Sequence, residues 1–358
     1  MKLNISPLKR YQIREVVFII SAFICYSMYL FLTASEFEDF PFIRALIGGS
    51  VLGIISAFFE MKLSKKFLRK FNFTSNILIA ILYYYVTFIA LVYSLIVSTE
   101  VYKNGLDFNT ALYHSFDILF SSQIQFMFLD LFFLIFIVSL IRQTRIMAGQ
   151  NVISNYVKGR YHNPRSEERF FMFLDLKSST EIAEKLGHQK YSRFLKKFFL
   201  EIDEITLETS GIIYQYVGDE VVMIWHKKDG IENNNVIRFF SLLDSRFNLL
   251  RDDFISEFGI FPEFKAGLHF GEVSITEVGG ILKTDIAYHG DPINTTSRIC
   301  VKCKELNKHL LVSKEVLDLL GNGDDSFKIY NEGRHLLKGK KKCVELFSIE
   351  QRPQLLET

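Results

Sequence analysis

The sequence is poor in several residue types, and each scarcity narrows the possibilities. It has 4 cysteines, 6 prolines and a single tryptophan among 358 residues, and its formal net charge is +2. Cysteines this few and scattered do not indicate a disulfide framework. A net charge near zero provides no extended basic footprint, so we expect no nucleic-acid partner.

Cys300 and Cys303 are the only closely spaced cysteines. They lie in a segment with helical periodicity, with no second cysteine pair and no histidine at ligand spacing. We therefore expect both thiols to be buried in a helix and not to bind metal.

Phenylalanine is abundant, with 36 residues, and it is densest before Leu140. Hydrophobic residues make up 49% of the chain. The uneven distribution predicts a membrane half and a soluble half, and the length allows two or three domains.

Four apolar segments occur in the first half, at about residues 16–33, 45–59, 77–97 and 124–141. Most approach the roughly 20 residues that a helix needs to cross a bilayer. The second segment is the shortest, and its Gly49 and Gly53 are spaced for a close helix–helix contact. These segments predict a four-helix transmembrane domain over residues 1–141, with the lipid bilayer as its partner.

The charged flanks of these segments indicate their orientation. Lysines and arginines precede the first segment, fill the loop after the second and follow the fourth, whereas the loop after the first is mainly acidic. The positive-inside rule therefore places both termini in the cytoplasm. No small-residue cleavage site follows the first segment, which favours an anchor over a removed signal peptide.

Asp130 lies inside the fourth apolar segment. A carboxylate at membrane depth is costly, so Asp130 is either hydrogen-bonded to a neighbouring helix or part of a functional site. Residues 142–165 form a polar connector that would continue the fourth helix until Asn163-Pro164 stops it. Such a connector could transmit a movement or act as a passive spacer.

In the soluble half, two aspartates fall at predicted strand ends. The apolar run 170–174 ends in Asp175, and residues 211–225 form two apolar runs about Gly218-Asp219, which predicts a hairpin. Two carboxylates at strand ends can hold divalent metal against phosphates. Alternatively, Asp175 caps the next helix and Asp219 only makes a turn.

Helical periodicity follows from residue 180 to 208, with an interruption near Gly187. Ser178, Ser179 or Thr180 can cap this helix, and the free N–H groups at its start suit a phosphate. A second helical stretch covers residues 232–257. The alternating segment 265–276 predicts a hairpin about Gly271.

Two later motifs could also bind phosphate. Pro292 suits a first helical turn, which places Asn294 and Arg298 on one helix face. Arginine there could bind a phosphate, or the face could simply be exposed and polar. The run Lys338-Gly339-Lys340 is either solvated or suited to a polyphosphate tail.

Together these motifs resemble the catalytic domain of class III nucleotidyl cyclases. The matching stretches, in the family's order, are Phe173-Leu-Asp-Leu-Lys-Ser-Ser-Thr180, Tyr216-Val-Gly-Asp-Glu220, Gly267-Leu-His-Phe-Gly271, Gly290-Asp-Pro-Ile-Asn-Thr-Thr-Ser-Arg298 and Lys338-Gly-Lys340. The resemblance implies a ferredoxin-like α/β catalytic domain at residues 166–350, active as a homodimer, with a tail at 351–358. It also implies an integral protein of a bacterial inner membrane with a cytoplasmic catalytic domain.

The resemblance also implies a role for each matching residue. Two divalent cations, Mg²⁺ or Mn²⁺, would be bound by Asp175 and Asp219 with the backbone of Leu176. Asn294 would orient the ribose, and Arg298 would stabilise charge at the α-phosphate. The triphosphate would contact a group of residues that comprises Ser178, Ser179, Thr180, Lys338 and Lys340. In the homodimer, the aspartates of one subunit would face Asn294 and Arg298 of the other.

The base-selecting positions depart from the family pattern. Gln215 and Ala287 stand where adenine-specific members commonly have lysine and aspartate or threonine, and where guanine-specific members have glutamate and cysteine. Glutamine can face either purine, and Asp285 is close enough in sequence to be recruited. We expect ATP, because adenylate cyclases are the larger bacterial group, with GTP as the alternative.

The resulting hypothesis is a membrane-anchored adenylate cyclase that makes 3′,5′-cyclic AMP and pyrophosphate. The alternatives are a guanylate cyclase, or a degenerate cyclase that only binds nucleotide or dimerises. The sequence Val217-Gly-Asp-Glu220 also resembles the diguanylate cyclase turn, but that family has no counterpart of Asn294 and Arg298.

Overall fold

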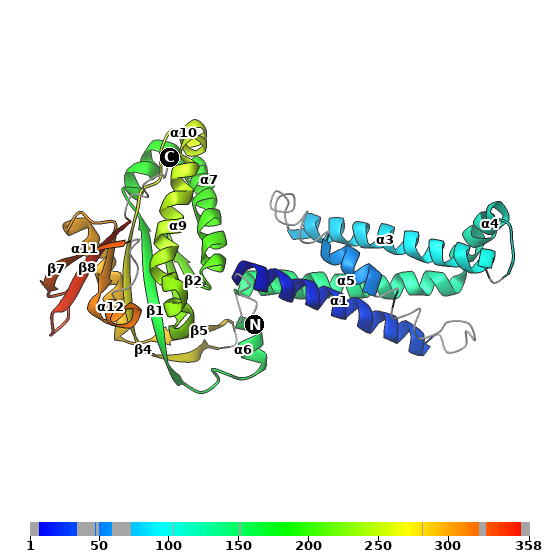
Figure 1. Ribbon diagram of the computed structural model, residues 1–358, viewed down its shortest axis with the longest axis horizontal. Coiled ribbons are helices and arrows are strands. Elements are labelled where there is room, and N and C mark those ends of the chain that lie inside the picture. Colours follow the sequence, from blue (N-terminus) through cyan, green and yellow to red (C-terminus); the bar gives the residue numbers. More distant parts are fainter. Residues whose placement is uncertain are drawn as a thin grey trace. The chain divides into compact units, whose positions relative to one another are not determined.

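The computed structural model describes residues 7–33, 47, 50–58, 73–102, 104–149, 152–280, 282–321 and 327–351. The chain divides into two compact units, a helical one at Lys9–Met147 and an α/β one that starts at Ala148 (Figure 1). The boundary between the two units lies at Met147 and Ala148.

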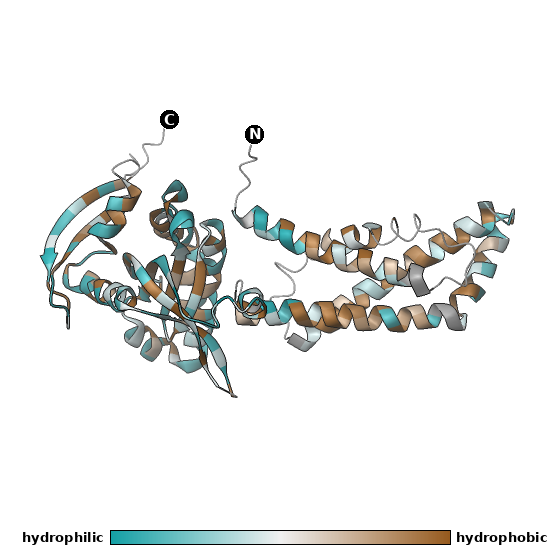
Figure 2. Cartoon of the chain, turned by 90° about the horizontal axis from the view of Figure 1, so that it is seen from below, coloured by the Kyte–Doolittle hydropathy of each residue, from teal (hydrophilic) through white to brown (hydrophobic). Residues whose placement is uncertain are grey.

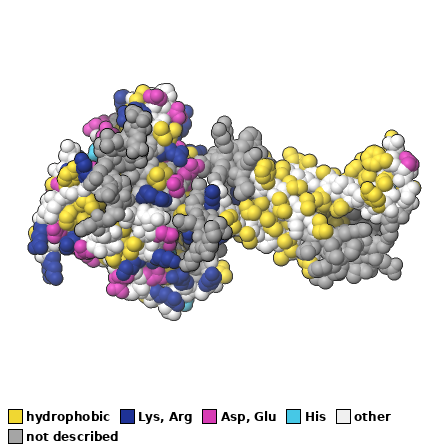
Figure 3. Space-filling model, in the orientation of Figure 1, with side chains coloured by type: hydrophobic (Ala, Val, Ile, Leu, Met, Phe, Trp, Pro, Cys, Tyr) yellow, Lys and Arg dark blue, Asp and Glu magenta, His cyan; other side chains and the backbone are white. Residues whose placement is uncertain are grey.

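The described residues of the helical unit include the helices α1 (Pro7–Thr33), α3 (Phe73–Tyr102), α4 (Phe108–Leu119) and α5 (Ser122–Ala148). Three of its segments are long and apolar enough to cross a membrane, namely Lys9–Tyr29, Thr74–Tyr102 and Gln125–Ala148. Apolar residues run along these helices (Figure 2), and hydrophobic side chains dominate the visible face of the unit (Figure 3). The first, third and fourth predicted segments therefore correspond to candidate spans.

Part of the second predicted segment, including Gly49 and both of its ends, lies outside the described residues. Residues 50–58 are helical. A β-carbon on Gly53 would come within 2.8 Å of the Ile20 Cα atom. This glycine therefore permits the close approach to α1 that its spacing predicted.

Asp130 of α5 faces a neighbouring helix. The hydroxyl of Tyr29 on α1 lies 3.5 Å from its Oδ2 atom. This contact matches the first of the two predictions for Asp130, a hydrogen bond between helices.

The connector is helical only in part. Helix α5 ends at Ala148, Gly149 has a φ of +88°, and a short helix α6 covers Val152–Val157. The first strand then begins at Arg165, directly after Pro164. A left-handed glycine thus divides the helix that the sequence predicted to be continuous, because that conformation interrupts the i to i−4 hydrogen-bond ladder.

One mixed sheet organises the α/β unit. Its strands are β1 (Arg165–Leu176), β2 (Ile212–Val217), β3 (Glu220–His226), β4 (Phe264–Gly279), β5 (Thr284–His289), β6 (Leu310–Ser313), β7 (Phe327–His335) and β8 (Val344–Gln351). They are ordered β2-β3-β1-β4-β6-β8-β7, and β5 pairs with β4. The β4–β6 pair is parallel, whereas the other recorded pairs are antiparallel.

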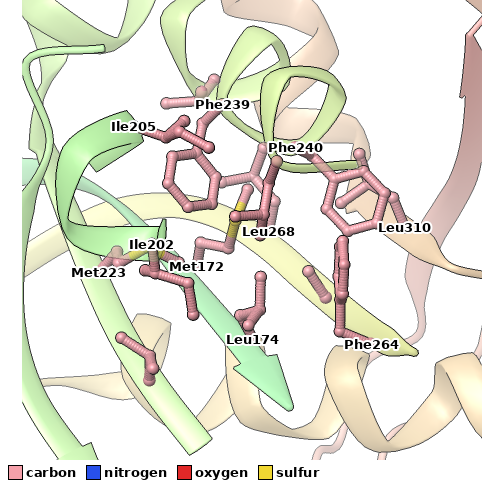
Figure 4. Packing of buried hydrophobic residues seen from close by; sticks show 14 of the residues in the cluster. Met172, Leu174, Ile202, Ile205, Met223, Phe239, Phe240, Phe264, Leu268 and Leu310 are labelled. Atoms are coloured by element: carbon pink, nitrogen blue, oxygen red, sulfur yellow. The ribbon is translucent and has the colours of Figure 1, made fainter. Parts of the chain in front are cut away.

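Helices cover both faces of this sheet. They are α7 (Ser179–Glu208), α8 (Lys227–Ile231), α9 (Asn235–Leu249), α10 (Arg251–Phe258), α11 (Asp291–Glu305) and α12 (Lys314–Leu320), with a 3₁₀ turn, η2, at Glu232–Asn234. On one face, side chains of α7 and α9 pack on Met172, Leu174 and Leu268 (Figure 4). On the other face, Cys300 of α11 packs on Phe173 and Val222. Cys300 and Cys303 are both buried, as predicted.

The predicted hairpin about Gly271 is wrong. Strand β4 runs unbroken from Phe264 to Gly279 and turns back into β5 only after that. A β-carbon on Gly271 would come within 2.5 Å of the Pro292 Cγ atom. Glycine is needed at this position for the close approach of the α11 N-terminus and not for a turn.

Candidate active site

Asp175 and Asp219 lie close together at one end of the sheet. Asp175 is next to last in β1, and Asp219 follows Gly218 in the β2–β3 turn, where Gly218 has a φ of +64°. Strand pairing sets Asp175 directly opposite Glu220. Both aspartates are half-buried. The sheet therefore brings together the two carboxylates that the sequence placed at strand ends.

Negative charge accumulates at this point. Burial raises the pKa of the Asp175 carboxyl, Lys265 opposes that rise, and the Asp219 carboxylate adds to it. Burial, followed by the charges of Asp175 and Asp219, raises the pKa of Glu220 to about 7. The raised pKa values reflect the cost of holding like charges together away from water. A cation bound among these groups would relieve that repulsion.

Lys265 is a member of this cluster that the sequence did not suggest. It forms an ion pair with Asp175, and β1–β4 pairing sets the two residues opposite each other. They are 90 positions apart in the sequence. Only the register of β4 against β1 reveals the contact.

The donor set suits a magnesium or manganese site that the substrate completes. Among the residues that the structure describes, no three His, Cys, Asp or Glu side chains gather to hold a metal. Mg²⁺ typically uses one or two carboxylates and takes its other ligands from water and phosphates. Asp175 and Asp219 supply two carboxylates, and the carbonyl of Leu176 ends the same strand. These residues therefore fit such a cation.

Helix α7 begins directly after the acidic cluster. Ser178 occupies its N-cap position with a φ of 52° and makes no side-chain capping bond. Ser179 and Thr180 form the first turn, and the helix is kinked at Gly187 as predicted. Ser178 therefore does not cap the helix through its side chain, as the sequence had suggested it could. The N–H groups of the first turn are thus able to bind an anion.

A second group of candidate residues lies on α11. This helix packs its buried residues, including Thr296, Ile299 and Cys303, against the sheet. Asn294 is exposed and Arg298 is half-buried. Helical geometry places both on the side away from the buried stripe, so they point away from the sheet of their own chain.

The Lys-Gly-Lys run lies beside Arg298. A β-carbon on Gly339 would come within 3.3 Å of the Arg298 Nη2 atom. Lys340 forms an ion pair with Asp291 in the first turn of α11, whereas Lys338 is exposed. The hydrogen bond from Lys340 is the main cause that lowers the pKa of Asp291. The fold thus brings Arg298 beside the loop that carries both lysines.

The base-selecting candidates lie on β2 and β5. Gln215 is exposed on β2, and Ala287 of β5 pairs with Thr276. Their neighbours Tyr214 and Tyr288 bring the two strands together, with ring centroids 4.8 Å apart. The Asp285 carboxylate pairs with Lys283 at 3.0 Å.

Comparison with known proteins identifies the class to which this arrangement belongs. Residues 162–351 match the family described as the adenylate and guanylate cyclase catalytic domain. That range holds both clusters and covers more than half of the chain. The protein therefore belongs to the class III nucleotidyl cyclases.

Individual relatives are similar over the same part. Adenylate cyclase 2 of Rhizobium meliloti (strain 1021) is 31% identical over 208 residues, which cover 58% of this chain and 56% of the relative. The terminal-differentiation specific adenylate cyclase of Dictyostelium discoideum is 23% identical over 49% of this chain and 8% of the relative. The chain therefore covers 56% of the length of the first relative and 8% of the length of the second.

Among solved structures, a bacterial light-regulated adenylyl cyclase superposes with a TM-score of 0.54 at 20% identity. The alignment covers 65% of this chain and 67% of that one. This similarity supports the fold of the catalytic half.

Proposed function

We propose that this protein is a membrane-anchored adenylate cyclase that converts ATP to 3′,5′-cyclic AMP and pyrophosphate. In this reaction the ribose 3′-oxygen bonds to the α-phosphorus, the bond to the bridging oxygen breaks, and the hydroxyl proton is released. The observation that carries the proposal is the meeting of Asp175 and Asp219 at the sheet end, beside a helix N-terminus that can bind phosphate.

Asp175, Asp219 and the carbonyl of Leu176 would hold two divalent cations, Mg²⁺ or Mn²⁺. When bound, such cations lower the pKa of a hydroxyl nucleophile and neutralise charge on phosphates. The first turn of α7, with Ser178, Ser179 and Thr180, would bind the triphosphate. The half-burial of both aspartates would strengthen the attraction for the cations.

The complete site would form between two copies of the chain. Asn294 would orient the ribose, Arg298 would stabilise charge at the α-phosphate, and Lys338 would contact the terminal phosphates. The position of Asn294 and Arg298 on the outer side of α11 supports this arrangement, because both can reach a partner there. In a two-fold dimer each site then combines the aspartates of one subunit with α11 of the other.

The helical unit would anchor the enzyme in the bacterial inner membrane. Three candidate spans support an anchor. The basic residues before the first span and after the last one favour a cytoplasmic location for the catalytic half.

ATP is the proposed substrate because relatives such as the Rhizobium and Dictyostelium proteins are named adenylate cyclases. GTP is the second candidate because Gln215 can hydrogen-bond to either purine and Ala287 offers no polar group. Asp285 is less suited to base recognition because Lys283 already holds it.

The proposal is tested by incubating the purified full-length protein with Mn²⁺ and either ATP or GTP, and identifying the product by mass spectrometry. We expect cyclic AMP from ATP, with no product from an Asp175→Asn variant. Cyclic GMP alone would favour the second candidate. No cyclic product from either nucleotide would point to a degenerate cyclase.

A further inference from the structure

Three charged residues form a row across three adjacent strands. Glu220 of β3 and Lys265 of β4 are the direct partners of Asp175 on β1, one on each side. Direct partners in antiparallel strands project from the same face of the sheet. The Asp175 carboxylate therefore has a carboxylate on one side and an ammonium group on the other.

The lysine in this row is shielded from solvent. Its side chain is 12% exposed and that of Asp175 is 26% exposed. A charge with so little access to water needs a partner. The partner of Lys265 is Asp175, the residue proposed to bind metal.

The balance of charge around Lys265 explains why it is needed. Three carboxylates, those of Asp175, Asp219 and Glu220, gather at this end of the sheet. Lys265 lies beside these carboxylates and forms its ion pair with Asp175. The ammonium group of Lys265 is thus a positive charge that the strand register sets against this acidic cluster.

We propose that Lys265 is a resident counter-ion that competes with divalent metal for Asp175. The inference rests on the proposed metal site and adds a positioning residue to it. The lysine occupies an oxygen of Asp175 before loading, and it must leave that oxygen when a cation binds. Since like charges repel, the ammonium group weakens metal binding and keeps the nucleotide-free cluster compact.

The test measures the dissociation constant of Mn²⁺ for the nucleotide-free, full-length protein. The electron paramagnetic resonance signal of free Mn²⁺ reports how much of the ion stays unbound. Lys265→Met removes the charge but keeps much of the side-chain length, and Lys265→Gln is a polar alternative should the first variant fold poorly. Lys265→Arg retains the charge. We expect the Lys265→Met and Lys265→Gln variants to bind Mn²⁺ roughly tenfold or more tightly than the wild type, since coupling energies of that size are measured for close charge pairs. The Lys265→Arg variant should bind Mn²⁺ as the wild type does.

Lys227→Met serves as the matched control. Lys227 also forms an ion pair in the α/β unit, with Glu168 at 2.8 Å, but on the surface. Its removal should leave Mn²⁺ binding at the wild-type level. A dissociation constant unchanged by both Lys265→Met and Lys265→Gln, in folded protein, would overturn the proposal.

Asp175→Asn separates this outcome from a failure of the proposed function. If Asp175→Asn abolishes Mn²⁺ binding and the uncharged Lys265 variants bind as the wild type does, the metal site stands and the counter-ion role is refuted. If Asp175→Asn binds Mn²⁺ normally, the metal site is elsewhere, and both proposals fall.

Discussion

The guanidinium group of Arg298 lies against Gly339, so that a β-carbon at Gly339 would come within 3.3 Å of Nη2. Gly339 also has a φ of +74°. The arginine proposed to act on the α-phosphate is thus positioned in part by the backbone of the Lys-Gly-Lys loop.

Gly339→Ala should therefore lower cyclase activity. The new methyl group would displace Arg298, and small displacements of catalytic groups cost roughly ten- to a hundredfold in rate. The left-handed backbone would add about 1–2 kcal/mol of strain. Gly259→Ala is the control, because Gly259 has a φ of +73° and no described atom within 4 Å of a new β-carbon. Equal activity losses in both variants would mean that strain alone is responsible.

Arg298→Ala should abolish turnover, with a loss on the order of 10²–10³-fold, since removal of a group that stabilises transition-state charge has that effect. Folding should be intact, and the single tryptophan, Trp225, reports it. Trp225 is fully buried, and its indole N–H donates to the Thr209 carbonyl at 3.0 Å. An unchanged Trp225 emission spectrum combined with lost activity is the expected result.

Mixing Arg298→Ala with Asp175→Asn should restore activity if each site is shared between subunits. Half of the randomly formed dimers would combine the two variants, and each of these would contain one intact site. The expected activity is therefore about a quarter of the wild-type value. A mixture that stays as inactive as its components would show that both residues act within one chain.

Lys338 and Lys340 should differ in their effect. Lys340 is paired with Asp291, so Lys340→Ala should act by releasing the loop from α11. The double variant Asp291→Asn/Lys340→Ala should then be no less active than Lys340→Ala, because contacting residues are non-additive. Lys338→Ala should instead raise the KM for nucleotide, and its effect should add to that of Asp291→Asn. If the activity losses add both for Asp291→Asn with Lys340→Ala and for Asp291→Asn with Lys338→Ala, the structural role of Lys340 is contradicted.

Acid should weaken the catalytic unit through His269. Burial lowers the pKa of this histidine from 6.5 to about 4, and its Nδ1 atom lies 2.7 Å from the Ser313 hydroxyl. Between these pH values the unfolded chain binds a proton that the folded chain does not, so stability should fall as the pH drops from 6.5 to 4. Each unit of pKa difference corresponds to about 1.4 kcal/mol.

Denaturant unfolding followed by Trp225 emission at several pH values measures this effect. His269→Asn can keep a hydrogen bond to Ser313 but has no proton to gain in this range, so its stability should depend less on pH. A pH profile identical to that of the wild type would assign the acid sensitivity to other groups.

Local sequence patterns were sufficient to predict many of the structural elements of this molecule. Three of the four apolar segments, the strand with Asp175 near its end, the turn at Gly218 and the kink at Gly187 were predicted, because each depends on residues close together in the chain. Gly271 was misassigned to a turn, because its neighbour Pro292 comes from a distant helix.

The sequence by itself therefore determined the two-part organisation and the family of the catalytic half, together with the identity of the metal-binding and phosphate-binding candidates. Only the tertiary structure decided that Lys265 neutralises Asp175, that Lys340 is held by Asp291, and that Arg298 lies beside Gly339. The physical reason is that strand register and helix packing bring together charges far apart in the chain, and neither periodicity nor motif spacing encodes those pairings.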